Sequence, residues 1–130
     1  MRARTSIAAA VAAVAFSTIL SAQTAAPAVP DAVHVMGGAI MDAKGMALYT
    51  YDNDKEPNKS ACMGNCLNNW PALKAAATDK DMGDWKVITR DDSTKQWAYK
   101  GKPLYYFAQD KAPGDKVGDG RGGVWHLAKP

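Results

Sequence analysis

The sequence predicts a mainly β domain, an antiparallel meander built from two pseudo-symmetric repeats, with one or two short helices. Three observations lead to this fold class. Short apolar segments of alternating character are separated by turns rich in glycine, proline and aspartate, as strands require. The second half of the chain repeats a motif of the first half at an offset of 56 residues. A length of 130 residues with 47% hydrophobic content suits one packed domain.

The N-terminus has the order of a secretory signal peptide. Arg2 and Arg4 precede an apolar run at 7–16, and small residues gather around Ala22, where we expect cleavage, with Ala26 as the alternative. The apolar run is too short for a comfortable membrane span, and no cysteine near the cut could carry a lipid. We therefore expect a soluble periplasmic protein with no transmembrane helix or lipid anchor in the mature chain.

These features divide the chain into three parts. Residues 1–22 form the signal peptide, residues 23–31 a flexible lead-in, and residues 32–130 a single β-rich domain. The repeats within that domain are expected at about 33–71 and 85–130. Without the signal peptide the net charge falls from +3 to about +1. Such a charge argues against a nucleic-acid partner, whose many phosphates would have to be neutralised.

The first repeat begins with a pair of extended segments around Gly37-Gly38, which suggests a bulge or kink. The expected strands of this repeat are, in order, 33–36, 39–41 and 46–51. After a polar loop, Ser60 is a good cap residue for a short helix that Pro71 ends. The stretch 72–84 is expected to be a variable excursion.

The second repeat is more strongly patterned. Its expected strands are 85–90, 95–99, 103–107 and 124–128, the first three forming a meander. The segment 110–123 contains five glycines and a proline, and is expected to be a loop.

The repeated motif aligns 45–57 with 101–113, where glycine, leucine, tyrosine, aspartate, lysine and proline coincide. Its chemistry-bearing residues are Tyr49, Tyr51 and Asp54 in the first copy and Tyr105, Phe107 and Asp110 in the second. The aromatic side chains of each copy share one face of a strand, because side chains alternate with period two. Each aspartate follows a strand end, where a carboxylate can cap a turn. We favour a structural role, with an aromatic and acidic ligand groove at the pseudo-symmetry axis as the alternative.

The motif Leu-Tyr-x-aromatic-x-x-Asp resembles the family called the secreted repeat of unknown function, also described as predicted lipoproteins with a Y-x-(F/W/Y)-x-x-D motif. The segment from Cys62 to Cys66, followed by Trp70-Pro71, is similar to the C-x-G-x-C and W-P element of that family. The resemblance extends over residues 33–130, and it implies no activity. The chain departs from many relatives in lacking the lipid-attachment cysteine.

Cys62 and Cys66 lie one helical turn apart, and in an oxidising periplasm we expect them to form a disulfide. The alternative is a metal or redox site. Cys62, Cys66 and Met63 are soft ligands suited to copper, and His126 could complete the set.

The remaining candidate residues favour structure over chemistry. Four tryptophans are large enough to fill a small core: Trp70, Trp85, Trp97 and Trp125. His126 follows one of them and is expected to be a structural histidine in a half-buried strand. The sequence contains no nucleophile and base in a known catalytic motif. We therefore expect no catalytic residue and no cofactor, in a non-enzymatic envelope scaffold or a module that binds an envelope protein or small ligand; a copper or redox accessory protein is the alternative.

Overall fold

The computed structural model describes Ala13 and residues 28–130. Apart from Ala13, the predicted signal peptide and its cleavage site lie outside the described residues. In chain order the elements are β1 (Val33–Met36), β2 (Ala39–Asp42), β3 (Tyr49–Tyr51), α1 (Cys66–Asn69), β4 (Trp85–Thr89), β5 (Lys95–Tyr99), β6 (Lys102–Pro103), the 3-10 turn η1 (Arg121–Gly123) and β7 (Trp125–Leu127).

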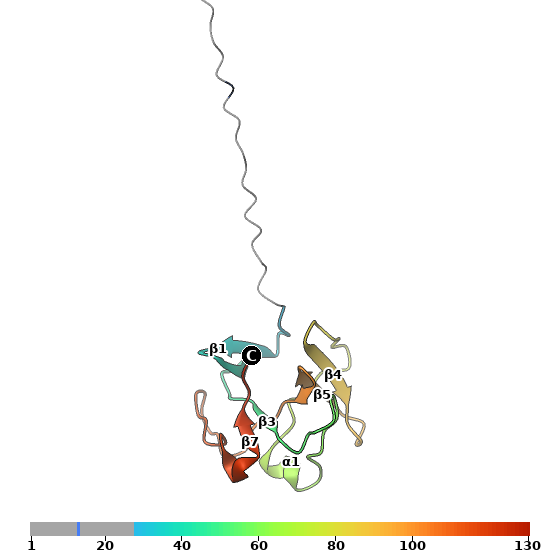
Figure 1. Cartoon of the computed structure of the whole chain (residues 1–130), viewed down its shortest axis with the longest axis vertical. Helices are drawn as coiled ribbons and strands as arrows, with labels where there is room; N and C mark the ends of the chain where they lie inside the picture. Colours follow the sequence, from blue (N-terminus) through green and yellow to red (C-terminus); the bar gives the residue numbers. More distant parts are fainter. Residues whose placement is uncertain (1–12, 14–27) are drawn as a thin grey trace, which may run out of the picture.

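The strands form three small antiparallel sheets, β1–β2, β3–β7 and β4–β5–β6. Figure 1 shows the β1–β2 and β4–β5 hairpins at one end of the molecule and α1 at the other. The predicted fold class, mainly antiparallel β with two repeats, is confirmed.

Each half of the fold contains the same three-stranded unit, a hairpin followed by the motif strand. In the first half Met41 of β2 bridges to Ala47, and in the second half Ala98 of β5 pairs with Pro103 of β6. The number of residues that separates Ala47 from Pro103 is nearly the same as the number that separates Met41 from Ala98. The two pairings therefore occupy corresponding positions in the repeats. The sequence repeat is therefore also a repeat of backbone pairing.

A ring of three backbone hydrogen bonds completes the first unit. The amide of Leu48 donates to the carbonyl of Ile40 at 3.2 Å, and that of Ile40 donates to the carbonyl of Ala128 at 2.9 Å. The amide of Ala128 completes the ring by donating to the carbonyl of Leu48 at 2.8 Å. Ala128 comes from the end of the second half, so the first unit is incomplete without it.

The second unit has the same ring with the contribution reversed. Leu104 donates to Trp97 at 3.0 Å, Trp97 donates to Leu73 at 2.9 Å, and Leu73 donates to Leu104 at 2.9 Å. Leu73 belongs to the first half of the chain. The two halves thus exchange their last segments, and Figure 1 shows the result as β7 lying beside β3.

The core consists of two hydrophobic clusters, and both contain residues from both halves. One comprises Val33, Ile40, Leu48, Leu73, Trp85, Trp97, Leu104 and Ala128. The other comprises Ala47, Tyr49, Cys62, Trp70, Tyr105, Phe107 and Trp125. Since neither cluster can form from one half alone, the repeats are expected to fold as one cooperative unit.

The predicted helix beginning at Ser60 is wrong. The helical turn α1 begins at Cys66, and Gly64 before it has a φ of +58°, which breaks a helix. The hydroxyl of Ser60 lies 2.7 Å from Arg90 Nη1 and 2.6 Å from Tyr105 Oη, so it serves a tertiary contact instead of a helix cap. The turn ends at Asn69, before Pro71.

Two smaller expectations also need correction. Gly37-Gly38 makes the tight turn of the β1–β2 hairpin, with both φ angles positive, and is no bulge. The stretch 72–84 is not wholly an excursion, because Ala72 bridges to Tyr105 and Lys74 bridges to Gln96. A short segment without clear alternation can still pair when it is inserted between two strands.

The exchange of end segments leads to a testable expectation for two fragments, 28–78 and 79–130. Each fragment alone lacks the strand that closes its unit, so each should show an unfolded far-UV circular dichroism spectrum and collapsed amide proton dispersion. An equimolar mixture should recover the spectrum of the intact chain 28–130, which is the control. A folded spectrum from either fragment alone would contradict the exchange.

Candidate functional site

The two motif tyrosines meet where the halves join. Tyr49 and Tyr105 form an antiparallel bridge, with the Tyr49 amide donating to the Tyr105 carbonyl at 2.8 Å and the reverse bond at 3.0 Å. Both side chains are completely buried. This pair lies at the pseudo-symmetry axis, because each residue occupies the same position in its own repeat.

Each tyrosine hydroxyl crosses to the aspartate of the other repeat. Tyr49 Oη donates to Asp110 Oδ2 at 2.6 Å, and Tyr105 Oη donates to Asp54 Oδ2 at 2.7 Å. The two residues of each bond are separated by 61 and 51 positions in the chain. The tyrosine and the aspartate of one motif copy therefore take part in two different interactions, each of which is made with the other copy.

The second oxygen of each aspartate holds the loop that follows it. Asp54 Oδ1 accepts from the amide of Ala61 at 2.6 Å, and Asp110 Oδ1 accepts from the amide of Val117 at 3.0 Å. In both repeats the donor lies seven residues further along the chain. The aspartates thus fix their loops against the opposite repeat.

Burial and the aspartate partners set the protonation of this site. Burial, followed by the hydrogen bond to Asp110, raises the pKa of Tyr49 well above its ordinary value of 10.0. Burial likewise raises the pKa of Tyr105, and the Asp54 carboxylate adds to the increase. Burial also raises the pKa of Asp54, against the opposing effect of the Ala61 amide and the Tyr105 hydroxyl. Both tyrosines are hydrogen-bond donors at neutral pH.

Four stacked rings occupy the axis beside the tyrosines. Tyr51 stacks on Trp125 with ring centroids 4.1 Å apart, and Trp125 stacks on Trp70 at 3.8 Å. Trp70 stacks in turn on Phe107 at 4.3 Å. Along this column, each ring from the first repeat is followed by a ring from the second repeat. The alternative expectation placed a ligand groove at the pseudo-symmetry axis. Packed aromatic side chains fill that position.

A buried polar network is attached to the Asp54 end of the site only. Arg90 is 6% exposed, and its Nη1 donates to Ser60 Oγ and to Gln96 Oε1, both at 2.7 Å. The hydroxyl of Ser60 continues the chain to Tyr105 Oη. Arg90 Nη2 also donates to the carbonyl of Cys62. This arginine connects the end of β4 to the motif through buried groups.

Sequence reasoning missed Arg90 and Gln96. Both stand at the ends of strands flanking a polar turn, where a charged residue is usually exposed. No periodic or motif signal marks either residue, because their counterparts in the first repeat, at the Gly37-Gly38 turn, are small. Their role depends on Ser60, which lies 30 positions from Arg90 in the sequence.

Cys62 and Cys66 are bonded to each other, with Cα atoms 5.3 Å apart. Their sulfur atoms are therefore joined in a disulfide, and neither is present as a thiolate. Cys62 is fully buried, and its carbonyl is the one that Arg90 contacts. In the second repeat the corresponding positions are Gly118 and Gly122. Only the first repeat carries this crosslink.

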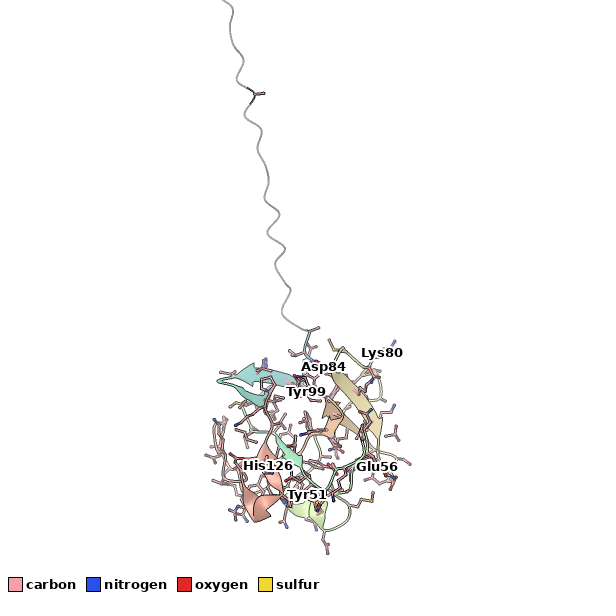
Figure 2. All side chains as sticks on the ribbon, in the orientation of Figure 1. Tyr51, Glu56, Lys80, Asp84, Tyr99 and His126 are labelled. Atoms are coloured by element: carbon pink, nitrogen blue, oxygen red, sulfur yellow. A yellow bond between two sulfur atoms is a disulfide. The ribbon has the colours of Figure 1, made fainter. Side chains whose placement is uncertain are left out.

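The other two residues of the alternative metal set lie on the surface. Met63 is 45% exposed, and the His126 ring is also exposed, with Nε2 lying 2.8 Å from Asp52 Oδ2. Figure 2 labels His126 beside β7. Strand β7 buries Trp125 and leaves His126 exposed, so this histidine lies on the outward face of a half-buried strand. Across residue 13 and residues 28–130, no three His, Cys, Asp or Glu side chains are grouped as a metal ion would need.

The four tryptophans all lie inside the fold. Their exposed fractions are 7% for Trp70, 3% for Trp85, 2% for Trp97 and 5% for Trp125. Trp70 and Trp125 belong to the stacked column, whereas Trp85 packs on Tyr99 with centroids 4.5 Å apart.

Comparison with known proteins gives one match. A family model described as a secreted repeat of unknown function matches residues 33–74 and again residues 86–129. No curated protein and no solved structure matches the chain. In the part of the chain that the structure describes, no helix has both the length and the apolar character to cross a membrane.

The crossed hydrogen bonds can be tested by double-mutant cycles. Tyr49→Phe combined with Asp110→Ala should show a coupling free energy of about 1–3 kcal/mol, because each change removes the same buried bond. Tyr49→Phe combined with Asp54→Ala is the control within one repeat, and should couple by less than about 0.5 kcal/mol. Urea unfolding gives both values, and a larger coupling in the control would contradict the crossed arrangement.

The raised tyrosine pKa values determine how stability changes in alkali. Above about pH 10 the unfolded chain releases the protons of Tyr49 and Tyr105 while the folded chain keeps them. The free energy of unfolding should therefore fall with rising pH by about 1.4 kcal/mol per pH unit for each tyrosine. Urea midpoints between pH 8 and 11.5 measure this slope. Tyr105→Phe should reduce the slope, whereas an unchanged midpoint in the wild type would contradict the protonated site.

Proposed function

The chain belongs to the family of the secreted repeat of unknown function, and on that premise we propose that it is a non-enzymatic envelope protein of the periplasm. Its role would be that of a scaffold or binding module. The family description itself supplies export and leaves the activity open.

The observation that carries this proposal is the use of the repeat motif within the fold. Tyr49, Tyr105, Asp54 and Asp110 are hydrogen-bonded to one another and to loop amides. A catalytic acid or base needs an atom that can reach a substrate. Tyr49, Tyr105 and Asp110 are buried, and both carboxylate oxygens of the partly exposed Asp54 already accept hydrogen bonds. The motif thus supports a rigid framework that presents its loops and outer strands to a partner.

The disulfide supports the exported location. Disulfides persist in oxidising compartments and are rare in reducing ones, so a bonded Cys62–Cys66 pair fits the periplasm. The positively charged and apolar N-terminal segment has the composition of a signal peptide that would lead there.

Native mass spectrometry of the exported full-length chain, purified without added metal or reductant, tests the proposal. We expect the mass of a chain cleaved near residue 22, lighter by two hydrogen atoms and free of adducts. A cytoplasmic, uncleaved chain would contradict export. A stoichiometric copper adduct on reduced cysteines would replace the binding-module function with the metal or redox alternative.

Replacing both cysteines by serine separates structure from chemistry. The loop closed by the disulfide is short, so Cys62→Ser with Cys66→Ser should lower the free energy of unfolding by about 2 kcal/mol. The amide spectrum of the folded protein should otherwise remain that of the wild type, except near α1 and Arg90. A loss well above this amount, with the tyrosine region perturbed, would show that the crosslink organises the site itself.

A further inference from the structure

The outer strands of the two hairpins, β1 and β4, are equivalent in the repeat. Each begins with the same tight turn, in which Val33 donates to the carbonyl of Pro30 at 3.0 Å and Trp85 donates to the carbonyl of Met82 at 2.8 Å. Pro30 therefore corresponds to Met82, and Val29 corresponds to Asp81. This equivalence allows the free edges of the two strands to be compared residue by residue.

The free edge of β4 is closed by its preceding loop. The amide of Met82 donates to the carbonyl of Trp85 at 2.8 Å. The next outward amide, that of Val87, donates to the carboxylate of Asp81 at 2.8 Å. A sheet edge blocked in this way is not available to pair with another strand.

Within residues 28–130, the corresponding edge of β1 lacks both closures. Pro30 has no amide hydrogen with which to repeat the Met82 bond, and Val29 has no acceptor with which to repeat the Asp81 bond. The amide of Ala43 donates to the carbonyl of Ala32 at 3.1 Å, so the even-numbered residues of β1 face β2 and the odd-numbered ones face outward. Val35 therefore directs its amide and its carbonyl away from the sheet.

The open edge borders an apolar groove. Its volume is about 760 Å³, and its walls include Val29 and Val35 on one side and Trp85 and Tyr99 on the other. Val35 is 43% exposed and Val29 is 38% exposed, so both apolar side chains are open to solvent at this edge. Figure 2 shows Tyr99 between the two hairpins, at the end of the molecule where this groove opens.

The groove leads toward a positively charged surface. Tyr99, Lys100 and Pro130 also line a second groove of about 290 Å³. Lys102 and Lys129 line this second groove as well, and the carboxylate of its aspartate, Asp52, lies 2.8 Å from His126 Nε2. The three lysines outnumber the two aspartates of the grooves, Asp84 and Asp52, so an occupant extending from the first groove into the second would meet a net positive charge from these side chains.

We propose that the open edge of β1 binds an extended segment of a partner protein, apolar at alternate positions and acidic at the end beside Lys100. The segment adds a strand to the β1–β2 sheet by hydrogen bonding to Val35, and its apolar side chains enter the groove toward Trp85 and Tyr99. Its acidic end lies beside the lysines. This proposal rests on the proposed function, because it names the partner chemistry of the binding module.

Amide hydrogen exchange tests the open edge without any partner. The amide of Val35 should exchange at least tenfold faster than that of Val87, its counterpart in β4. Val29→Asp supplies the carboxylate that β4 already has, and should slow exchange at Val35 at least tenfold, whereas Val29→Ala should not. Equal protection of Val35 and Val87 in the wild type would overturn the inference.

Binding is tested with two fluorescein-labelled peptides, Thr-Val-Thr-Val-Asp-Asp and the same peptide ending in Lys-Lys. The wild-type chain should bind the acidic peptide at least tenfold more tightly, as measured by fluorescence anisotropy. Val29→Asp and Lys100→Glu should each weaken that binding at least tenfold. Val29→Ala trims the groove wall without adding a carboxylate, and should weaken binding much less than Val29→Asp does. Lys95→Glu is the matched charge control and should leave binding within twofold, since Lys95 lies at the far end of β5.

Two results would overturn the proposal. The first is the absence of binding of either peptide to the wild-type chain. The second is a concentration-dependent dimer in sedimentation equilibrium that Val29→Asp dissociates, which would assign the edge to a second copy of the chain. Neither result alters the mass, cleavage or oxidation state of the exported chain, so failure here is distinguishable from failure of the proposed function.

Discussion

The fold depends on the Tyr49–Tyr105 pair and the hydrogen bonds that cross from it to the opposite aspartates. Neither repeat can satisfy its own tyrosine, because the carboxylate that each hydroxyl needs belongs to the other repeat. Leaving a buried tyrosine or aspartate without its partner would cost about 1–3 kcal/mol. The exchanged end segments and the stacked tryptophans surround this centre, so the two halves become one domain by completing each other.

The two halves differ in how the loop after each motif aspartate is held in place. Gly118 lies so close to the rings of Tyr49, Phe107 and Trp70 that an added Cβ would approach them within about 3 Å. At the corresponding position the first repeat has Cys62, which its disulfide and Arg90 hold in place. One repeat thus fixes its loop by close packing of a glycine, and the other by a crosslink and a buried arginine.

The sequence could predict the elements and the repeat because these depend on local patterns. Alternating residues located the strands of both hairpins, although the Gly37-Gly38 turn between β1 and β2 was expected to be a bulge or kink. The recurrence of Tyr49, Asp54 and their counterparts marked the two units. It could not predict which tyrosine meets which aspartate, because a repeated motif is satisfied equally well within a repeat or between repeats. The helix at Ser60 failed for a related reason, since a serine suited to a cap can serve a distant arginine instead.

The internal repeat also gives each residue a control within the same chain. Contacts present in both halves, such as the tyrosine–aspartate bonds, are explained by folding alone. Contacts present in only one half include the disulfide and the Arg90 network, which fix the first loop, and the closure of the β4 edge. Where the second half has Met82 and Asp81, the first half has Pro30 and Val29, which cannot form the hydrogen bonds that close the edge of β4. An edge left open beside an apolar groove, in a fold that can close it, is the feature of this structure that folding does not require.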